Sequence, residues 1–235
     1  EGGLSARYAI YFAPHPDSRW WAFGSAWLGY DALTGAAVAQ PTVAGVAAEA
    51  FARLTRAPAR YGFHATLKAP MRLAPGCDEA TLDAALARFA AGRTPFTLPR
   101  MQVERLEGFL ACTPVGHCAA LHALADDCVR AFDAFRAPPD AAELAKRRAA
   151  GLTADQETML ARWGYPYVFQ RFRFHMTLTG PLAGVPPDIA KAVRAAAAAA
   201  VAALADEPLV ADAVCLFTQP GPDAAFRLHR RIPFG

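Results

Sequence analysis

Two histidine segments of this sequence match each other in residue type and spacing. They are Phe63-His64-Ala65-Thr66-Leu67 and Phe174-His175-Met176-Thr177-Leu178. Each is typical of a β-strand, in which successive side chains point to opposite faces. His64 and Thr66 then share one face of the first strand, and the second motif repeats this with its own histidine and threonine. We expect the fold to bring these two polar faces together as one active site.

The paired histidines indicate acid–base chemistry, because imidazole is the side chain whose ordinary pKa lies nearest neutrality. A lone histidine on a strand is more often a structural residue, but two in matching frames are much less expected by chance. One neutral and one protonated imidazole supply a base and an acid to opposite sides of a phosphodiester bond. The threonine hydroxyls can donate hydrogen bonds to its non-bridging oxygens. This chemistry needs no metal or other cofactor, and the sequence shows none of the usual metal-ligand groupings.

Three further residues border the predicted site. Lys68 and Arg173 share the strand faces of the two histidines and are placed to neutralise a second phosphate or the non-bridging oxygens. A solvated strand edge is an equally good interpretation of both. Tyr61 falls on the opposite parity, so it faces the cleft only if the first strand begins after it. Arg171 lies further from its motif, and a solvated position is favoured for it.

The composition excludes several classes of protein. Of the 235 residues, 54% are hydrophobic, which is ample for a folded core, and the net charge of +3 permits an anionic substrate without indicating a protein that coats nucleic acid. The apolar stretch 189–204 is mostly alanine and too weakly apolar to span a membrane. Five cysteines without a C-x-x-C pair argue against a disulfide framework or a zinc site and favour a reducing cytoplasm. Residues 1–4 show no signal-peptide pattern.

Strand and helix signals alternate along the chain. Besides the motif strands, of which the second spans 167–178, strands are expected at 7–13, 96–98, 101–106, 109–115, 209–217 and 225–232. Helices are expected at 18–29, 43–55, 78–92, 117–135, 143–148, 153–163 and 186–205. The first helix carries Trp20, Trp21 and Trp27, for which core or interface packing is favoured over a base-stacking or sugar-binding surface.

The same order of elements follows each motif strand: a proline stop, a helix and antiparallel strands. This repeat predicts an α+β fold with a duplicated, bilobal architecture, in which two small antiparallel sheets face a central cleft and the helices lie outside. The polar segment 136–165 separates the halves, and we interpret it as a helical insertion or lid within a single domain covering residues 1–235.

The two motifs resemble those of the 2H phosphoesterase superfamily, which includes RNA 2′,3′-cyclic phosphodiesterases of the RNA-ligase-like group. The strings R-Y-G-F-H-A-T-L-K-A-P (residues 60–70) and R-F-H-M-T-L-T-G (residues 173–180), with the N-terminal R-Y-A-I-Y-F-A-P, are most similar to the branch encoded in bacterial phosphonate-utilisation operons. The resemblance extends over essentially the whole chain. It implies a bilobal fold in which His64 and His175 are catalytic and Thr66 and Thr177 contact the substrate.

The resemblance and the motif chemistry together predict a hydrolase, namely a metal-independent phosphodiesterase that opens a cyclic phosphate on a small nucleotide or a ribose. The expected partner is a small phosphorylated substrate, with an RNA end as another possibility and no membrane or metal. One alternative is a binding module for RNA ends or nucleotides that uses the tryptophan helix and the C-terminal arginines. Another is RNA 2′,5′-joining by reversal of the same chemistry. The sequence does not say which histidine is the acid.

Overall fold

The computed structural model describes residues 6–149 and 151–235, which fold into helices and small antiparallel sheets. The expected α+β fold class is thereby confirmed. Residues 1–4, to which the signal-peptide expectation refers, lie outside the described residues. The strands are β1 (Arg7–Phe12), β2 (Ala65–Met71), β3 (Phe96–Thr97), β4 (Met101–Leu106), β5 (Phe109–Pro114), β6 (Met176–Thr177), β7 (Val210–Ala211), β8 (Ala213–Gln219) and β9 (Arg227–Pro233). The helices are α1 (Arg19–Leu28), α2 (Ala48–Ala59), α3 (Glu79–Ala91), α4 (Ala119–Ala131), α5 (Ala141–Arg148), α6 (Ala154–Trp163) and α7 (Pro187–Ala202), with 3-10 turns η1 (Asp133–Phe135) and η2 (Phe169–Arg171).

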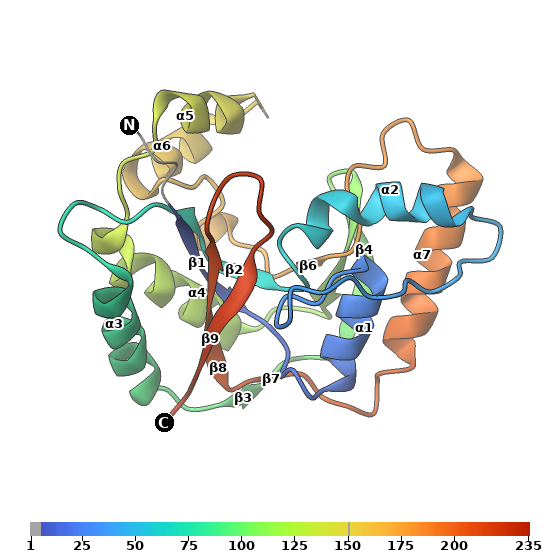
Figure 1. Cartoon of the computed structure of the whole chain (residues 1–235), viewed down its shortest axis with the longest axis horizontal. Helices are drawn as coiled ribbons and strands as arrows, with labels where there is room; N and C mark the ends of the chain where they lie inside the picture. Colours follow the sequence, from blue (N-terminus) through green and yellow to red (C-terminus); the bar gives the residue numbers. More distant parts are fainter. Residues whose placement is uncertain (1–5, 150) are drawn as a thin grey trace.

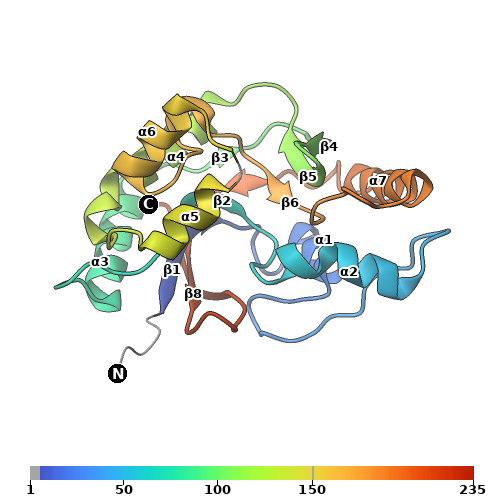
Figure 2. The same cartoon turned by 90° about the horizontal axis from the view of Figure 1, so that it is seen from above.

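The two main sheets meet at the motif strands. One sheet has the order β2-β1-β8-β9, the other has the order β4-β5-β6, and a small third sheet pairs β3 with β7. Strands β2 and β6 are therefore edge strands, and they pack against each other near the centre of the molecule (Figures 1 and 2). The topology brings the two histidine motifs together along this seam.

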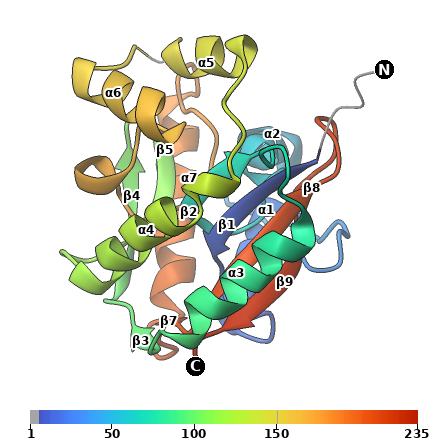
Figure 3. The ribbon, with the colours of Figure 1, turned by 90° about the vertical axis from the view of Figure 1, so that its left-hand side faces the viewer.

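Helices cover the outer faces of the sheets. Helix α3 packs on β8 and β9, helix α4 packs on β2, and helix α7 packs on β4. Figure 3 shows α3 lying across the face of β8 and β9, with α5 and α6 together at one end of the molecule. The segment 136–165, called the helical insertion below, forms α5 and α6 as expected.

Local capping signals explain where several helices begin and end. The Ser18 hydroxyl accepts a hydrogen bond from the Trp21 N–H at the start of α1, and Gly29 ends this helix with a φ of 74°. Thr153 begins α6 with a capping box. Asp78 caps the start of α3 in the same way.

The tryptophans of α1 belong to the core. Trp20, Trp21 and Trp27 are buried, and the Trp27 indole N–H donates to the Leu178 carbonyl at 2.9 Å. The expectation of core packing for these side chains is confirmed. Helix α1 is thereby attached to the second motif. Within the described residues, no helix combines the length and the apolarity needed to cross a membrane.

Helix α2 continues through Pro58, which was expected to lie beyond its end. Proline has no N–H to donate to the carbonyl four residues earlier, so the Leu54 carbonyl is left without its helical partner. That carbonyl instead accepts a hydrogen bond from the Gly180 N–H at 2.7 Å. This hydrogen bond connects α2, which precedes the first motif, to Gly180 at the end of the second motif.

The second motif strand is much shorter than the expected 167–178. Strand β6 pairs with β5 only through Ala111 opposite Thr177 and Cys112 opposite Met176. Continued pairing would place Pro114, which has no N–H, opposite Phe174. The segment before β6 therefore leaves the sheet and forms η2 and an extended connection.

Candidate functional site

Both motif histidines lie immediately before their strands and make the same local hydrogen bond. His64 precedes β2 and His175 precedes β6. The Nδ1 atom of His64 lies 2.9 Å from the Gly62 carbonyl oxygen, and the Nδ1 atom of His175 lies 2.7 Å from the Arg173 carbonyl oxygen. Because a carbonyl oxygen only accepts, each neutral ring carries its proton on Nδ1. The Nε2 atom of both rings is then left as the proton acceptor.

Burial favours the neutral form of both rings. It lowers the pKa of His64 to about 4, against a raising effect of the Gly62 hydrogen bond and with a further lowering by the charge of His175. Burial also lowers the pKa of His175 below its ordinary value. Both imidazoles are therefore neutral near pH 7.

Two cavities open beside the seam, and each of them is lined by residues of both motifs. A cavity of about 510 Å³ is lined by His175 of the second motif and Thr66 of the first. A cavity of about 280 Å³ is lined by His64 of the first motif and Thr177 of the second. Phe109 lines both cavities and lies between them. Each cavity thus combines a histidine from one motif with the threonine of the other.

Tyr61 and Arg173 lie where they can contact a ligand. Tyr61 precedes β2, as its exposure to the cleft required, and it lines the smaller cavity with its ring 6.3 Å from that of His64. Arg173 lines the larger cavity, and its guanidinium contributes to the lowered pKa of His175. Arg171 is solvent-exposed, as favoured for it, and it also lines the same cavity. Its guanidinium pairs with Asp155 at 2.9 Å.

Lys68 lies elsewhere than the strand alternation predicts. It is 4% exposed and donates to the Asp133 carboxylate at 2.9 Å and to the Val129 carbonyl at 3.1 Å. Helix α4 and η1 cover this end of β2. The face of β2 that reaches the cavity at Thr66 is therefore part of the protein core at Lys68. Lys68 lines neither of the two cavities, and its expected position at the border of the site is corrected.

The structure adds aromatic residues that the motifs did not indicate. Tyr11 of β1 stacks on the His64 ring with 3.7 Å between ring centroids and 21° between planes. Tyr165 and Tyr167 line the larger cavity, with Phe109 from β5. The first strand contains two tyrosines, Tyr8 and Tyr11, so the sequence alone did not single out Tyr11. The pairing of β1 with β2 sets Tyr11 opposite Thr66.

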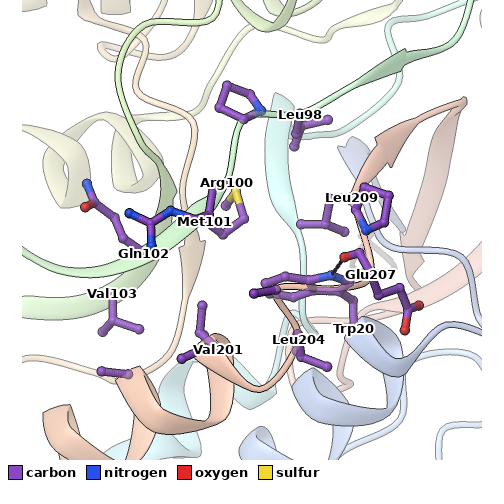
Figure 4. Close-up of a pocket in the computed structure, with 15 residues that line it drawn as sticks. Trp20, Leu98, Arg100, Met101, Gln102, Val103, Val201, Leu204, Glu207 and Leu209 are labelled. Atoms are coloured by element: carbon purple, nitrogen blue, oxygen red, sulfur yellow. Dashed lines mark hydrogen bonds between the residues drawn. The ribbon is translucent and has the colours of Figure 1, made fainter.

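A separate cavity lies away from both motifs. It has a volume of about 490 Å³ and lies between α7, β4 and the start of α1 (Figure 4). Its floor includes Trp20, whose indole N–H donates to the Glu207 carbonyl at 2.8 Å. Neither motif histidine nor motif threonine lines this cavity, so we do not assign the motif chemistry to it.

Comparison with known proteins identifies the family. The family described as "Protein of unknown function (DUF1045)" matches residues 66–227, which include Thr66, His175 and Thr177. The chain belongs to this family. Membership of the broader 2H phosphoesterase superfamily stays a prediction.

Two curated relatives carry the same name. The "Ribose 1,5-bisphosphate phosphokinase PhnN" of Janthinobacterium sp. (strain Marseille) is 43% identical over 232 residues, which cover 97% of this chain and 51% of the relative. The protein of that name from Laribacter hongkongensis (strain HLHK9) is 42% identical over 226 residues, which cover 96% of this chain and 51% of the relative. The chain therefore spans about half the length of these curated relatives.

The relatives' name corrects the expected function. A phosphokinase transfers a phosphoryl group to an acceptor and belongs to the transferases, which contradicts the predicted class of hydrolase. The prediction of a cyclic phosphodiesterase is therefore wrong by this finding. The hydrolase class was inferred from the motif chemistry and the superfamily resemblance together, but paired histidines serve any reaction that moves protons near phosphate. Contact with an RNA end is not addressed by these names and stays a prediction.

Proposed function

We propose that this chain binds a phosphorylated ribose between its two H-x-T motifs. The observation that supports this proposal is that each cavity contains residues of both motifs: Thr66 shares a cavity with His175, and Thr177 shares a cavity with His64. One phosphate group placed at the seam can reach donors from both sheets. The name of the relatives, which contains a ribose bisphosphate, supports a ligand of this class.

The donors around the seam suit a phosphate group. Threonine hydroxyls and protonated imidazole nitrogens donate to phosphate oxygens, and the exposed guanidinium of Arg173 adds a positive charge at the larger cavity. Gln156, Gln170 and Glu107 line the same cavity and can bond to sugar hydroxyls. The lining thus provides for both halves of a sugar phosphate.

In the free protein, His64 is a proton acceptor. Its pKa of about 4 keeps Nε2 unprotonated near neutral pH, and the Gly62 carbonyl fixes the ring so that Nε2 faces Thr66 at 3.3 Å. An incoming ribose hydroxyl can donate to this nitrogen. A bound phosphate instead favours the protonated form of both imidazoles, because it places negative charge beside them.

We propose that this chain binds the sugar phosphate and does not bind a nucleoside triphosphate. The P-loop signature GxxxxGK[ST] requires a lysine directly after a glycine, and none of the three lysines in this sequence follows one. The relatives' name is consistent with the phosphonate-operon branch that the motifs resemble. We therefore place the ligand among the ribose phosphates of phosphonate metabolism.

Calorimetric titration with ribose 5-phosphate and ribose 1,5-bisphosphate tests this function. We expect both compounds to bind, and we expect Thr66→Val or Thr177→Val to weaken binding about tenfold each, because each removes one hydrogen bond to a charged oxygen. Thr97→Val is the matched control, since Thr97 is exposed on β3 and lines neither cavity. The proposal fails if neither compound binds, or if the motif variants bind as well as the control.

A further inference from the structure

The helical insertion and the segment after it form one wall of the larger cavity. Tyr165 directly follows Gly164, which ends α6 with a φ of 72° and so turns the chain back toward the cavity. Tyr167 comes two residues later, and the two rings meet edge to face with 5.5 Å between centroids and 75° between planes. Phe109 lines the cavity from β5, on the opposing sheet.

Tyr165 lies close to the first motif as well as the second. Burial, and then charge on Tyr61 and Tyr165, raises the pKa of Tyr11, the tyrosine that stacks on His64. Burial raises the pKa of Tyr165 itself, and Tyr61 contributes to that shift. Tyr165 lines the larger cavity together with Thr66 of the first motif and His175 of the second. Tyr165 thus reaches the seam at which the phosphate is proposed to bind.

Several contacts anchor the helical insertion that carries Tyr165. The Arg147 guanidinium of α5 lies 4.9 Å from the centroid of its ring. Arg136, at the start of the insertion, donates to the Asp133 carboxylate at 2.9 Å, and the same carboxylate accepts from Lys68 of β2. The insertion is thereby anchored to the sheet that carries the first motif.

A second set of ion pairs fixes the insertion to the rest of the molecule. The Arg72 guanidinium, just after β2, lies 2.9 Å from the Glu143 carboxylate of α5. The Arg171 guanidinium of η2 lies 2.9 Å from the Asp155 carboxylate of α6. The aromatic wall is therefore connected to the segments leaving β2 and entering β6. A wall held from both motifs is suited to a fixed ligand position.

We propose that Tyr165 and Tyr167 form the subsite for the sugar ring of the phosphorylated ligand. This inference rests on the proposed function, because the phosphate between the motifs places the ring in the larger cavity. The aromatic faces contact the apolar C–H surface of a sugar ring, and the phenol hydroxyls and the neighbouring amides bond to its hydroxyl groups. The subsite discriminates sugar phosphates from phosphate alone.

Titration of wild type and variants with two ligands tests this subsite. The ligands are inorganic phosphate, which has no ring, and ribose 5-phosphate. We expect Tyr165→Ala and Tyr167→Ala to weaken binding of ribose 5-phosphate about fivefold each, because an aromatic contact of this kind contributes about 1 kcal/mol. We expect binding of inorganic phosphate to change less than twofold. Tyr165→Phe should lose less than Tyr165→Ala, since it keeps the ring.

Arg148→Gln is the matched control in the same insertion. It removes the Arg148–Glu157 ion pair on α5 and α6, and neither residue lines the larger cavity. We expect this variant to bind both ligands like wild type, and we expect all variants to keep the wild-type far-ultraviolet circular dichroism. A general disturbance of the insertion would also lower binding in the control.

The outcomes separate the two proposals. If neither ligand binds to wild type, the proposed function itself fails. If both ligands bind equally well, or if the tyrosine variants weaken phosphate and ribose 5-phosphate to the same extent, the sugar subsite is overturned while phosphate binding at the motifs stands. Preferential loss of ribose 5-phosphate binding in both alanine variants supports the subsite.

Discussion

At the scale of single residues, the site depends on one local device that occurs twice. Each motif histidine bonds through Nδ1 to the carbonyl oxygen of the residue two positions earlier, Gly62 for His64 and Arg173 for His175. The strand alternation predicted the positions of the histidines and threonines. It did not predict this bond, because the bond depends on the chain being outside the strand at the histidine. The carbonyl sets the tautomer, so both Nε2 atoms are the reactive ones.

The depressed pKa values make a prediction about titration. In the free protein we expect the His64 imidazole to titrate near pH 4, and that of His175 below its ordinary range, because burial opposes their charged forms. Nitrogen-15 chemical shifts of the two rings measure this directly. Addition of ribose 5-phosphate should raise both pKa values. A His64 ring that titrates at pH 6.5 or above in the free protein would contradict the burial described here.

The same shift fixes the sign of a pH effect on stability. The unfolded chain protonates His64 near pH 6.5 and the folded chain only near pH 4, so the unfolded state binds more protons between these values. The contribution of His64 to the free energy of unfolding should therefore be greatest above pH 6.5, and protein stability should decline as the pH falls toward 4. Urea unfolding at several pH values measures the slope, and His64→Asn should reduce it.

At the scale of elements, close packing between α1 and the first motif positions His64. Gly24 of α1 lies against the ring of Phe63, and a Cβ atom at Gly24 would come within 2.1 Å of that ring. Phe63 directly precedes His64. The sequence predicted α1 and its caps but not this contact, because no local pattern specifies which residue of a helix meets another element.

We expect Gly24→Ala to destabilise the protein by about 1–3 kcal/mol, although alanine favours a helix by about 1 kcal/mol over glycine. The clash with Phe63 outweighs the helix propensity, since the ring is buried and cannot move outward. Gly92→Ala is the control, because a Cβ atom there meets nothing closer than 4.0 Å. Urea unfolding gives both values. Equal stability of the two variants would show that α1 does not press on the first motif.

Element predictions succeeded where the signal was local and failed where it depended on neighbours. Strand β4 and the capped helices α3 and α6 lie where turn and capping residues placed them. The second motif strand was predicted too long, because its pairing partner ends in Pro114. Lys68 was placed at the site by alternation alone, whereas the helix covering that face was not visible in the sequence.

At the scale of the whole molecule, the two main sheets are not two successive halves of the chain. The first motif strand β2 lies in a sheet with β1, β8 and β9, and the second motif strand β6 lies beside the β4–β5 hairpin. Each motif is still followed by a helix, a short strand and a hairpin, as the repeat predicted. The β4–β5 hairpin that follows the first motif therefore pairs with β6 of the second motif, and the β8–β9 hairpin that follows the second motif lies in the sheet of the first motif. A single bilobal domain over the whole chain stays a prediction.

The repeat explains why the site could be predicted but its chemistry could not. Matching motifs imply matching surroundings, and the structure places the four motif residues on two adjoining cavities. The reaction depends on what else lines those cavities, including Phe109, Tyr165 and Arg171, which come from segments without a recognisable motif. The relatives' name then corrected the class of enzyme that the motifs alone had suggested.

A crystal structure of the chain with ribose 5-phosphate tests the central claim most directly. We predict that the phosphate lies at the seam, with oxygens within hydrogen-bond distance of both His64 and His175 and of at least one motif threonine, and with the ribose ring against Tyr165. A phosphate bound elsewhere, such as in the cavity of Figure 4, or contacting only one of the two histidines, would contradict the account.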